Sequence, residues 1–152
     1  MTHEDLAAEL APLTLPQFDE TVALRLGAML VAIAQAETLP VVINIRSANR
    51  TFFHAALPGS SPVNDNWARR KSNLALYSGQ ASMIVALKFK AQGRSLAIEG
   101  LPTSDYADSG GAVPLVVSGA GLVAVCTVSG LPQEADHALV VRGLVALRAA
   151  LS

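Results

Sequence analysis

The residues best placed to bind a ligand lie at the turn between the last predicted strand and the last predicted helix. Ser129 and Gly130 end an apolar run, and their backbone amides face the positive end of the dipole of the helix that follows. A turn of this kind suits a phosphate or a carboxylate. Glu134 and Asp136 stand in the first turn of the same helix and compete for the same positive potential. The turn therefore holds either a bound anion or the chain's own carboxylates.

A second group of residues can supply positive charge to that turn. Lys71 follows Trp67 by one helical turn, so we expect its aliphatic stem to pack on the indole and its ammonium to reach a pocket rim. Arg70 or Arg69 adds charge if the two helices converge. The alternative is ordinary solvated charge, or charge that meets another subunit.

The three histidines, His3, His54 and His137, offer few metal or catalytic arrangements. His137 follows Asp136, which either orients the imidazole toward a ligand or complements the helix dipole while the ring packs at the core edge. His54 lies in a predicted strand, where it either ligates haem iron or forms ordinary hydrogen bonds. We expect no metal centre built from protein side chains alone.

The sequence carries none of the common catalytic motifs. It has no phosphate-binding P-loop, no dinucleotide-binding glycine pattern, no His-Glu-x-x-His, no Cys-x-x-Cys and no Gly-x-Ser-x-Gly. The sequence therefore identifies no catalytic residues. It leaves open whether the chain is an enzyme, and it favours a role without turnover.

The composition predicts one domain, residues 1–152, that assembles with copies of itself. Charged residues make up 15 % of the chain, against about 25 % in typical domains. So little charge favours burial of part of the surface in a homo-oligomer, although many alanines also raise the hydropathy. No apolar run reaches the length of a membrane span, and the N-terminus does not resemble a secretion signal, so we expect a cytoplasmic protein. Cys126, the single cysteine, is predicted to be a buried, inert thiol.

The charges are unevenly distributed along the chain. Residues 46–94 hold eight basic residues and one acid, a net charge of +7, whereas the flanks hold three basic residues and eleven acids. The basic segment indicates either an anion site or a surface that meets acidic surfaces of other subunits. It does not indicate nucleic-acid binding, because the domain as a whole is not basic and no nucleic-acid motif accompanies the segment.

Hydrophobic periodicity and turn residues predict an α/β (α+β) domain. Two apolar runs flank Ser118-Gly119-Ala120-Gly121, which reads as a hairpin turn, and the second run is apolar enough to be a central strand. We expect Asn64 or Asp65 to cap the helix that carries Trp67, and Ser82 to cap the next helix. The expected helices are 4–11, 15–37, 64–78, 82–90 and 133–150, and the expected strands are 41–45, 51–57, 95–99, 113–117 and 122–128.

Three segments resemble a known family. Residues 58–71 are similar to a Gly-Thr…Asn-x-x-Trp-x-x-x-Lys pattern, 110–114 to Gly-Gly-x-x-Pro, and 127–141 to Val-Ser-Gly-Leu-Pro…Asp-His…Val-Val. These are patterns of the HbpS/GlcG-like (haem-degrading-domain) proteins, in particular their uncharacterised branch. The likeness spans about residues 19–151, and Val63 departs from it where a polar residue is expected.

The resemblance implies a profilin-like domain, an antiparallel five-stranded sheet flanked by helices, that assembles into dimers or larger rings. Some relatives bind or degrade haem, but no axial ligand carries over to a residue of this chain; His54 and His137 are the imidazoles available.

The sequence therefore predicts a homo-oligomeric binding module for a small anionic ligand. Haem binding or degradation is one alternative, and a structural or adaptor assembly without a ligand is another. The predicted site consists of these residues: Trp67, Arg70, Lys71, Gly110, Gly111, Ser129, Gly130, Asp136 and His137.

Overall fold

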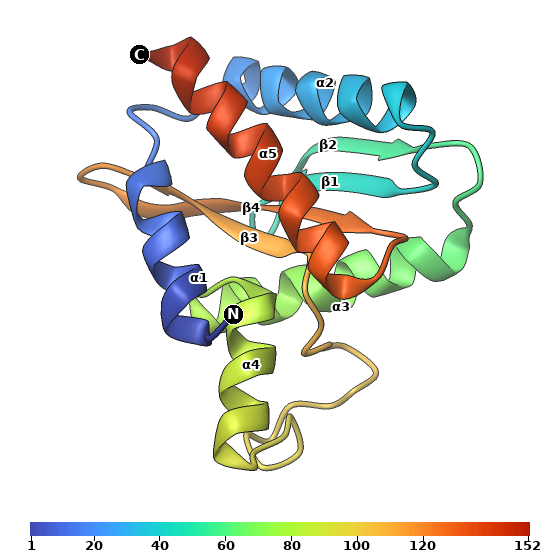
Figure 1. Ribbon diagram of the computed structural model, residues 1–152, viewed down its shortest axis with the longest axis vertical. Coiled ribbons are helices and arrows are strands. Elements are labelled where there is room, and N and C mark those ends of the chain that lie inside the picture. The colour runs from blue at the N-terminus through green and yellow to red at the C-terminus, as the bar shows by residue number, and fades with distance from the viewer.

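The computed structural model describes residues 1–152, and a four-stranded antiparallel sheet forms its centre (Figure 1). The strand order is β2-β1-β4-β3, so β4 lies inside the sheet between β1 and β3, as its apolar sequence predicted. The strands are β1 (Val42–Arg46), β2 (Thr51–Ala56), β3 (Ala112–Val117) and β4 (Gly121–Ser129).

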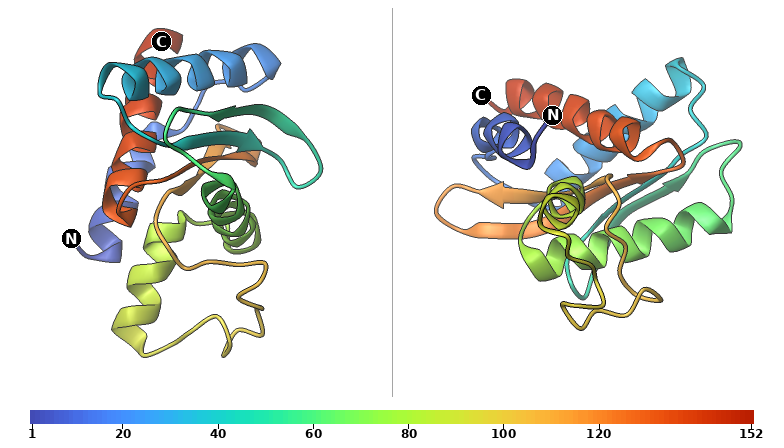
Figure 2. Two further views of the ribbon diagram at one scale, coloured as in Figure 1. Left: turned by 90° about the vertical axis from the view of Figure 1, so that its right-hand side faces the viewer. Right: turned by 60° about the horizontal axis from the view of Figure 1, so that its bottom comes forward.

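Helices cover both faces of this sheet (Figure 2). Helices α2 (Glu20–Ala36) and α5 (Gln133–Leu151) lie on one face, and α3 (Pro62–Ser78) lies on the other. The short helix α1 (His3–Leu10), the 3-10 turn η1 (Ala11–Leu13) and α4 (Ser82–Gln92) pack near β3. None of these helices combines the length and the apolar composition needed to cross a membrane.

The two faces of the sheet differ in polarity because side chains alternate along each strand. Ile43 and Ile45 of β1 belong to the main hydrophobic core beneath α2 and α5. Asn44 and Arg46 alternate with them and therefore face α3. The α3 side of the sheet thus encloses polar groups, and this layer is where the candidate site lies.

The predicted fifth strand, residues 95–99, is wrong. The segment is a turn in which Leu101 N–H donates to Leu96 O and Gly100 N–H donates to Ala97 O. Leu96 is buried in a small separate cluster with Leu74 and Val85, so packing against α3 and α4 fixes the segment locally. The segment pairs with no strand, and the sheet stops at four strands.

Helix starts also differ from the predictions. Helix α2 begins at Glu20, with Asp19 Oδ1 accepting from Val22 N–H, because Leu15 pairs instead with the end of β3 through Val116 O. Helix α3 begins at Pro62, where proline is favoured. Its cap residue is Ser61, so the predicted caps lie inside the helix.

The predicted cap of α4 is also displaced. Ser82 is the first helical residue rather than the cap, and its hydroxyl accepts a hydrogen bond from Ala112 N–H at 3.0 Å. Ser82 thus satisfies a backbone donor of β3. The predicted hairpin at 118–121 and the burial of Cys126 are both confirmed.

Candidate functional site

The predicted ligand turn is the centre of a buried ion pair. Lys71 Nζ donates to Asp136 Oδ2 at 2.8 Å and to Val128 O at 3.3 Å, and the two side chains are only 3 % and 1 % exposed. The ammonium is therefore inside the protein rather than at a pocket rim. It joins α3 to β4 and α5.

Asp136 uses its second oxygen to close the strand-to-helix turn. Its Oδ1 accepts from Leu131 N–H at 2.9 Å, and Gly130 N–H is a further backbone donor to the carboxylate. The carboxylate of the chain itself thus occupies the positive end of α5. The turn needs glycine, because Gly130 has φ +146° and an added Cβ would lie 2.4 Å from Pro40 O.

Burial controls the protonation of this pair. Burial raises the pKa of Asp136, and the Lys71 charge and hydrogen bond oppose that rise. Burial likewise lowers the pKa of Lys71, and Asp136 opposes that fall. Each group therefore depends on the other to remain charged.

The two glycines before β3 also meet this cluster. An added Cβ at Gly111 would lie 2.9 Å from Lys71 Nζ, and Gly110 N–H donates to Gln133 Oε1 at 3.0 Å. Ser129 is buried at the end of β4. The structure thus brings together Lys71, Gly111 and Asp136 from the predicted set; as a site for an external ligand, the set stays a prediction.

Trp67 and Arg70 lie outside this cluster. The Arg70 guanidinium stacks over the Trp67 ring at 4.4 Å from the centroid, so Arg70 supplies the cation that lies over the indole. The neighbouring Arg69 binds Asp105 and Ser104 O. Trp67 is 38 % exposed, which leaves this pair on the outer surface of α3.

His137 lies next to the ion pair in sequence but faces a different space. Its ring is 4 % exposed and neither ring nitrogen has a hydrogen-bond partner. It lines a cavity of about 380 Å³ together with Leu6, Met83 and Leu87, and with Glu9 at the same cavity. Burial lowers the pKa of the imidazole, although Glu9 opposes this, so the ring is neutral at pH 7.

A polar cavity that the sequence analysis did not identify lies between α3 and the outer half of the sheet. Its volume is about 430 Å³. Strands β1 and β2 contribute one wall and α3 contributes the other. The polar side chains that line it are Asn44, Arg46, Thr51, His54, Asp65, Arg69 and Asn73.

Arg46 is the main positive charge of this polar cavity. Its guanidinium donates to Ser72 Oγ at 2.9 Å, to Ser47 O at 3.3 Å and to Asn73 Oδ1. All three acceptors are neutral, and no carboxylate pairs with it. Burial lowers its pKa, with a further contribution from the charge of Arg69. A half-buried guanidinium without a counter-ion has lost part of its hydration without gaining a compensating negative charge, and a bound anion would supply that charge.

His54 is held rigidly at the other end of the polar cavity. Its Nε2 lies 2.9 Å from Asp65 Oδ1, and its Nδ1 lies 3.1 Å from Asn44 Nδ2. With the Asn44 amide donating, Nδ1 accepts and Nε2–H donates to Asp65. Both ring nitrogens are therefore engaged, and neither is free to ligate a metal in this arrangement.

Two buried side-chain oxygens near His54 lack hydrogen-bond partners. His54, Asn44 and Thr127 stand opposite one another on β2, β1 and β4. Asn44 Oδ1 and Thr127 Oγ1 are both buried and form no hydrogen bond within the chain. Unpaired buried polar atoms are uncommon and call for an explanation, such as a bound ligand or water.

A signal for this layer was present in the sequence. Asn44 and Arg46 alternate with Ile43 and Ile45 in a strand that is otherwise apolar. A charged residue in such a strand predicts a polar face, but whether solvent or a helix covers that face depends on the tertiary structure.

Comparison with known proteins gives consistent matches. A family profile described as "Haem degrading protein HbpS-like" matches residues 18–145. A UPF0303 protein of Paraburkholderia xenovorans is 44 % identical over 142 residues, covering 93 % of this chain and 86 % of the relative. A UPF0303 protein of Streptomyces avermitilis is 43 % identical over 144 residues, covering 94 % of this chain and 88 % of that protein.

Solved structures share the fold. The crystal structure of the Ybr137w protein superposes with a TM-score of 0.89 at 28 % identity, covering 97 % of this chain and 88 % of that one. A PduOC–haem complex superposes with a TM-score of 0.71 at 21 % identity, covering 86 % and 94 %. The HbpS double mutant of Streptomyces reticuli gives 0.70 at 21 % identity, covering 86 % and 87 %. The last two similarities concern the fold alone.

Proposed function

The chain belongs to the HbpS-like haem degrading protein family, and from that membership we propose that it is a homo-oligomeric protein that binds a small anionic ligand in the polar cavity beneath α3. The observation that carries the proposal is Arg46, a half-buried guanidinium that faces this cavity and has no carboxylate partner. Guanidinium binds carboxylate and phosphate oxygens through two parallel hydrogen bonds. Three of its five N–H groups are already used, and two remain for a ligand.

The other groups of the polar cavity narrow the chemistry of the ligand. Asn44 Oδ1 is buried and lacks a donor, and the half-exposed Asp65 carboxylate binds His54 through Oδ1 only. A ligand that satisfies these acceptors must carry a hydroxyl or amino hydrogen as well as a negative charge. The arrangement therefore suits a small carboxylate that bears a hydroxyl group.

Isothermal titration calorimetry tests the site with lactate, malate and inorganic phosphate as probes. Arg46→Gln should weaken the binding of the hydroxycarboxylates by about 10- to 100-fold, the usual effect of losing a charged hydrogen bond. Arg50→Gln is the matched control, because Arg50 lies on the same hairpin, is exposed and pairs with Glu20. Equal effects of the two variants, or no binding of any probe, would show that the polar cavity is not an anion site.

Self-assembly is supported by apolar side chains that the monomer leaves exposed. Leu24 of α2 is 56 % exposed and Val145 of α5 is 52 % exposed, on two helices that cross and pack against each other (Figure 1). Tyr77 and Ile98 add further apolar surface elsewhere. Sedimentation velocity should show an oligomer that Leu24→Glu and Val145→Glu shift toward smaller species. A protein that is monomeric at all concentrations would contradict the proposal.

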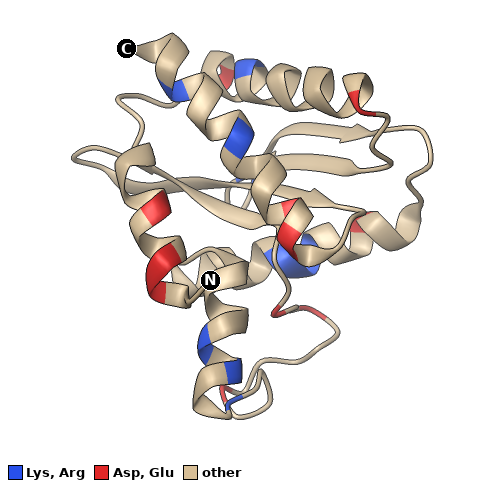
Figure 3. Cartoon of the chain, in the orientation of Figure 1, with Lys and Arg blue, Asp and Glu red and all other residues tan.

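The charge distribution bears on the same assembly. Basic residues mark α3 and α4, whereas acidic residues mark α1 (Figure 3). If these surfaces meet between subunits, the oligomer should dissociate as salt is raised, because exposed charges are screened over about 8–10 Å at physiological ionic strength. An assembly held by the apolar surface of α2 and α5 should not respond to salt.

Haem binding is the second candidate, and His137 is the residue that favours it. The family description and the haem complex of a protein with the same fold concern haem. Of the histidines predicted for this role, His54 has both ring nitrogens engaged, whereas both nitrogens of His137 are free of hydrogen bonds in a cavity with apolar walls. Haem supplies a redox-active iron when it is bound.

The acidic residues that line the His137 cavity disfavour haem, although its apolar side chains suit the porphyrin ring. Glu9 and Glu134 line the cavity, and no basic residue does, so the propionates would meet like charge. Titration with haemin, followed by the Soret band, separates the possibilities. A band that His137→Ala removes and His54→Ala preserves would support ligation by His137; a band that neither substitution changes would exclude both.

A further inference from the structure

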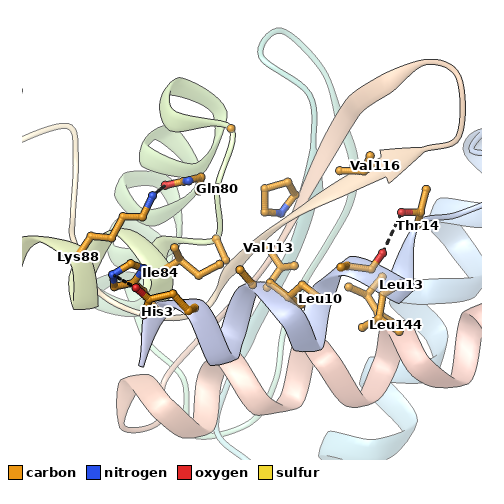
Figure 4. A pocket seen from close by; sticks show the side chains of 16 residues that line it. His3, Leu10, Leu13, Thr14, Gln80, Ile84, Lys88, Val113, Val116 and Leu144 are labelled. Atoms are coloured by element: carbon orange, nitrogen blue, oxygen red, sulfur yellow. Dashed lines mark hydrogen bonds and ion pairs between the residues drawn. The ribbon is translucent and has the colours of Figure 1, made fainter. Parts of the chain in front are cut away.

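We propose that the chain has a second binding site, separate from the polar cavity, that takes an unbranched aliphatic carboxylate. The site is a cavity of about 560 Å³ between α1, α4, α5 and β3 (Figure 4). This volume falls in the usual range for small-molecule sites, about 300–1,000 Å³. We name it the acyl cavity; its walls, the lysine at one end and the strand edge beside it indicate the ligand.

The walls of the acyl cavity are aliphatic. Leu10 and Leu13 of the N-terminal segment face Ile84 of α4 and Val113 of β3, and Leu144 of α5 closes the base (Figure 4). None of these five side chains carries a polar atom. A hydrocarbon chain would lose contact with water here without leaving a buried polar group unpaired.

The edge of β3 beside the acyl cavity does not suit a peptide. Ala112 N–H is taken by Ser82, Pro114 has no N–H, and Leu15 already pairs with the strand at Val116. A peptide that adds to a sheet edge binds mainly through backbone hydrogen bonds. Few remain along this edge, so the acyl cavity suits a ligand that recognises apolar surface.

One end of the acyl cavity holds the side chain of a lysine, Lys88. Lys88 is half-buried, and its Nζ has a single partner, the neutral amide oxygen of Gln80 at 3.4 Å (Figure 4). Glu4 lies at the same end, but His3 Nε2 binds its carboxylate at 3.1 Å, and Glu4 is largely exposed. Lys88 is thus an ammonium without a salt-bridge partner at one end of the acyl cavity. A carboxylate head group with an alkyl tail matches both features.

The N-terminal segment builds much of the acyl cavity. Seven of its sixteen lining residues lie between His3 and Thr14, before the start of the family match at residue 18. The polar cavity, in contrast, lies wholly within the matched residues. The acyl cavity is therefore built in part by residues that the family profile does not cover.

A chain-length series tests the proposal on the full-length protein. Calorimetry with hexanoate, octanoate and decanoate, each below its micelle concentration, should give a Kd that falls about fourfold per added methylene, from about 0.8 kcal/mol per buried CH₂. Lys88→Gln should weaken decanoate binding about tenfold and leave the binding of decanol unchanged. Lys90→Gln is the matched control, because Lys90 lies on the same helix, is exposed and does not line the acyl cavity.

A second variant guards against indirect effects. Ala7 is exposed on α1 and lines the acyl cavity, so Ala7→Trp should fill it and abolish decanoate binding while the circular dichroism spectrum stays unchanged. Equal loss in Lys88→Gln and Lys90→Gln would overturn the proposal. So would an absent chain-length trend, or decanoate binding that Ala7→Trp does not affect, since either would point to adsorption on exposed apolar surface.

Discussion

Replacing Lys71 by methionine tests the central electrostatic feature of this fold. Methionine keeps the length and the apolar stem of the side chain but removes the ammonium that pairs with Asp136 at 2.8 Å. Both side chains are almost fully buried, so Asp136 would be left as a carboxylate without a counter-charge. Its remaining partners are the backbone N–H groups of Leu131 and Gly130.

The expected loss is large because only one member of the pair is removed. Breaking a buried ion pair in this way destabilises proteins by about 3–5 kcal/mol, whereas replacing both charges is often nearly neutral. Lys71→Met should therefore lower the free energy of unfolding by about 3–5 kcal/mol at pH 7. The double variant Lys71→Met/Asp136→Asn should recover more than half of that loss. The difference defines a coupling energy between the two residues.

The loss should depend on pH with a definite sign. Burial already raises the pKa of Asp136, and Lys71 is the main influence that opposes this rise, so the variant has a folded-state pKa still further above the unfolded value. A carboxyl group whose pKa is higher in the folded protein than in the unfolded chain stabilises the fold fully below the unfolded pKa, which is about 4 for aspartate. This stabilisation is lost as pH rises through the pKa of the folded protein. Lys71→Met should thus become less stable from pH 5 to pH 8, by at most about 1.4 kcal/mol per pH unit.

Guanidinium chloride unfolding, followed by the fluorescence of Trp67, the single tryptophan, and by circular dichroism, measures these quantities. Protein concentration must be held fixed, because an oligomer couples unfolding to mass action. Lys90→Met is the control for removing an exposed lysine, and it should change the stability by less than about 0.5 kcal/mol. A loss below about 1 kcal/mol in Lys71→Met, or a loss that does not change with pH, would refute the reasoning.

Three further predictions concern Gly130, His137 and Cys126. Gly130→Ala should lower the free energy of unfolding by about 2–4 kcal/mol, because a Cβ at φ +146° would lie 2.4 Å from Pro40 O. In the control Gly93→Ala the added Cβ meets nothing within 4 Å, so the loss should be about 1 kcal/mol. Thermal melts of the two variants measure the difference. The NMR titration midpoint of His137 should lie below 6.5, and the stability lost as pH falls through it should disappear in His137→Leu. Cys126, whose thiol pKa is raised by burial, should not react with a thiol reagent until the protein unfolds.

Local signals in the sequence predicted most of the fold. The apolar run of β4 placed it inside the sheet, and the two glycines of the 118–121 turn marked its hairpin with β3. The prediction of a strand over residues 95–99 is wrong, because its composition suits a strand only where an open sheet edge is available for pairing. The burial of Leu96 against α3 and α4 decided otherwise.

The structure brings Lys71, Gly111 and Asp136 of the predicted site together, but it places Trp67, Arg70 and His137 elsewhere. Sequence reasoning brought Lys71 and the Ser129–Gly130 turn together across 57 or more positions of the chain, and the structure shows them in contact through Asp136. The sequence predicted the Lys71 ammonium at a pocket rim. Helical spacing gives the direction of a side chain around the helix, but not how deeply the neighbouring sheet buries it. The cation over the Trp67 ring is the Arg70 guanidinium.

The sequence by itself determined most of the element types, the central place of β4 and the need for glycine at the last turn, because each depends on residues close together in the chain. Only the tertiary structure decided which charges are paired. Lys71 meets a carboxylate 65 positions away, while Arg46 and Lys88 meet none. The pairing of a charge depends on which side chains the fold places within a few ångströms, and long-range packing alone sets those distances. For this reason the polar cavity and the acyl cavity became visible only in three dimensions.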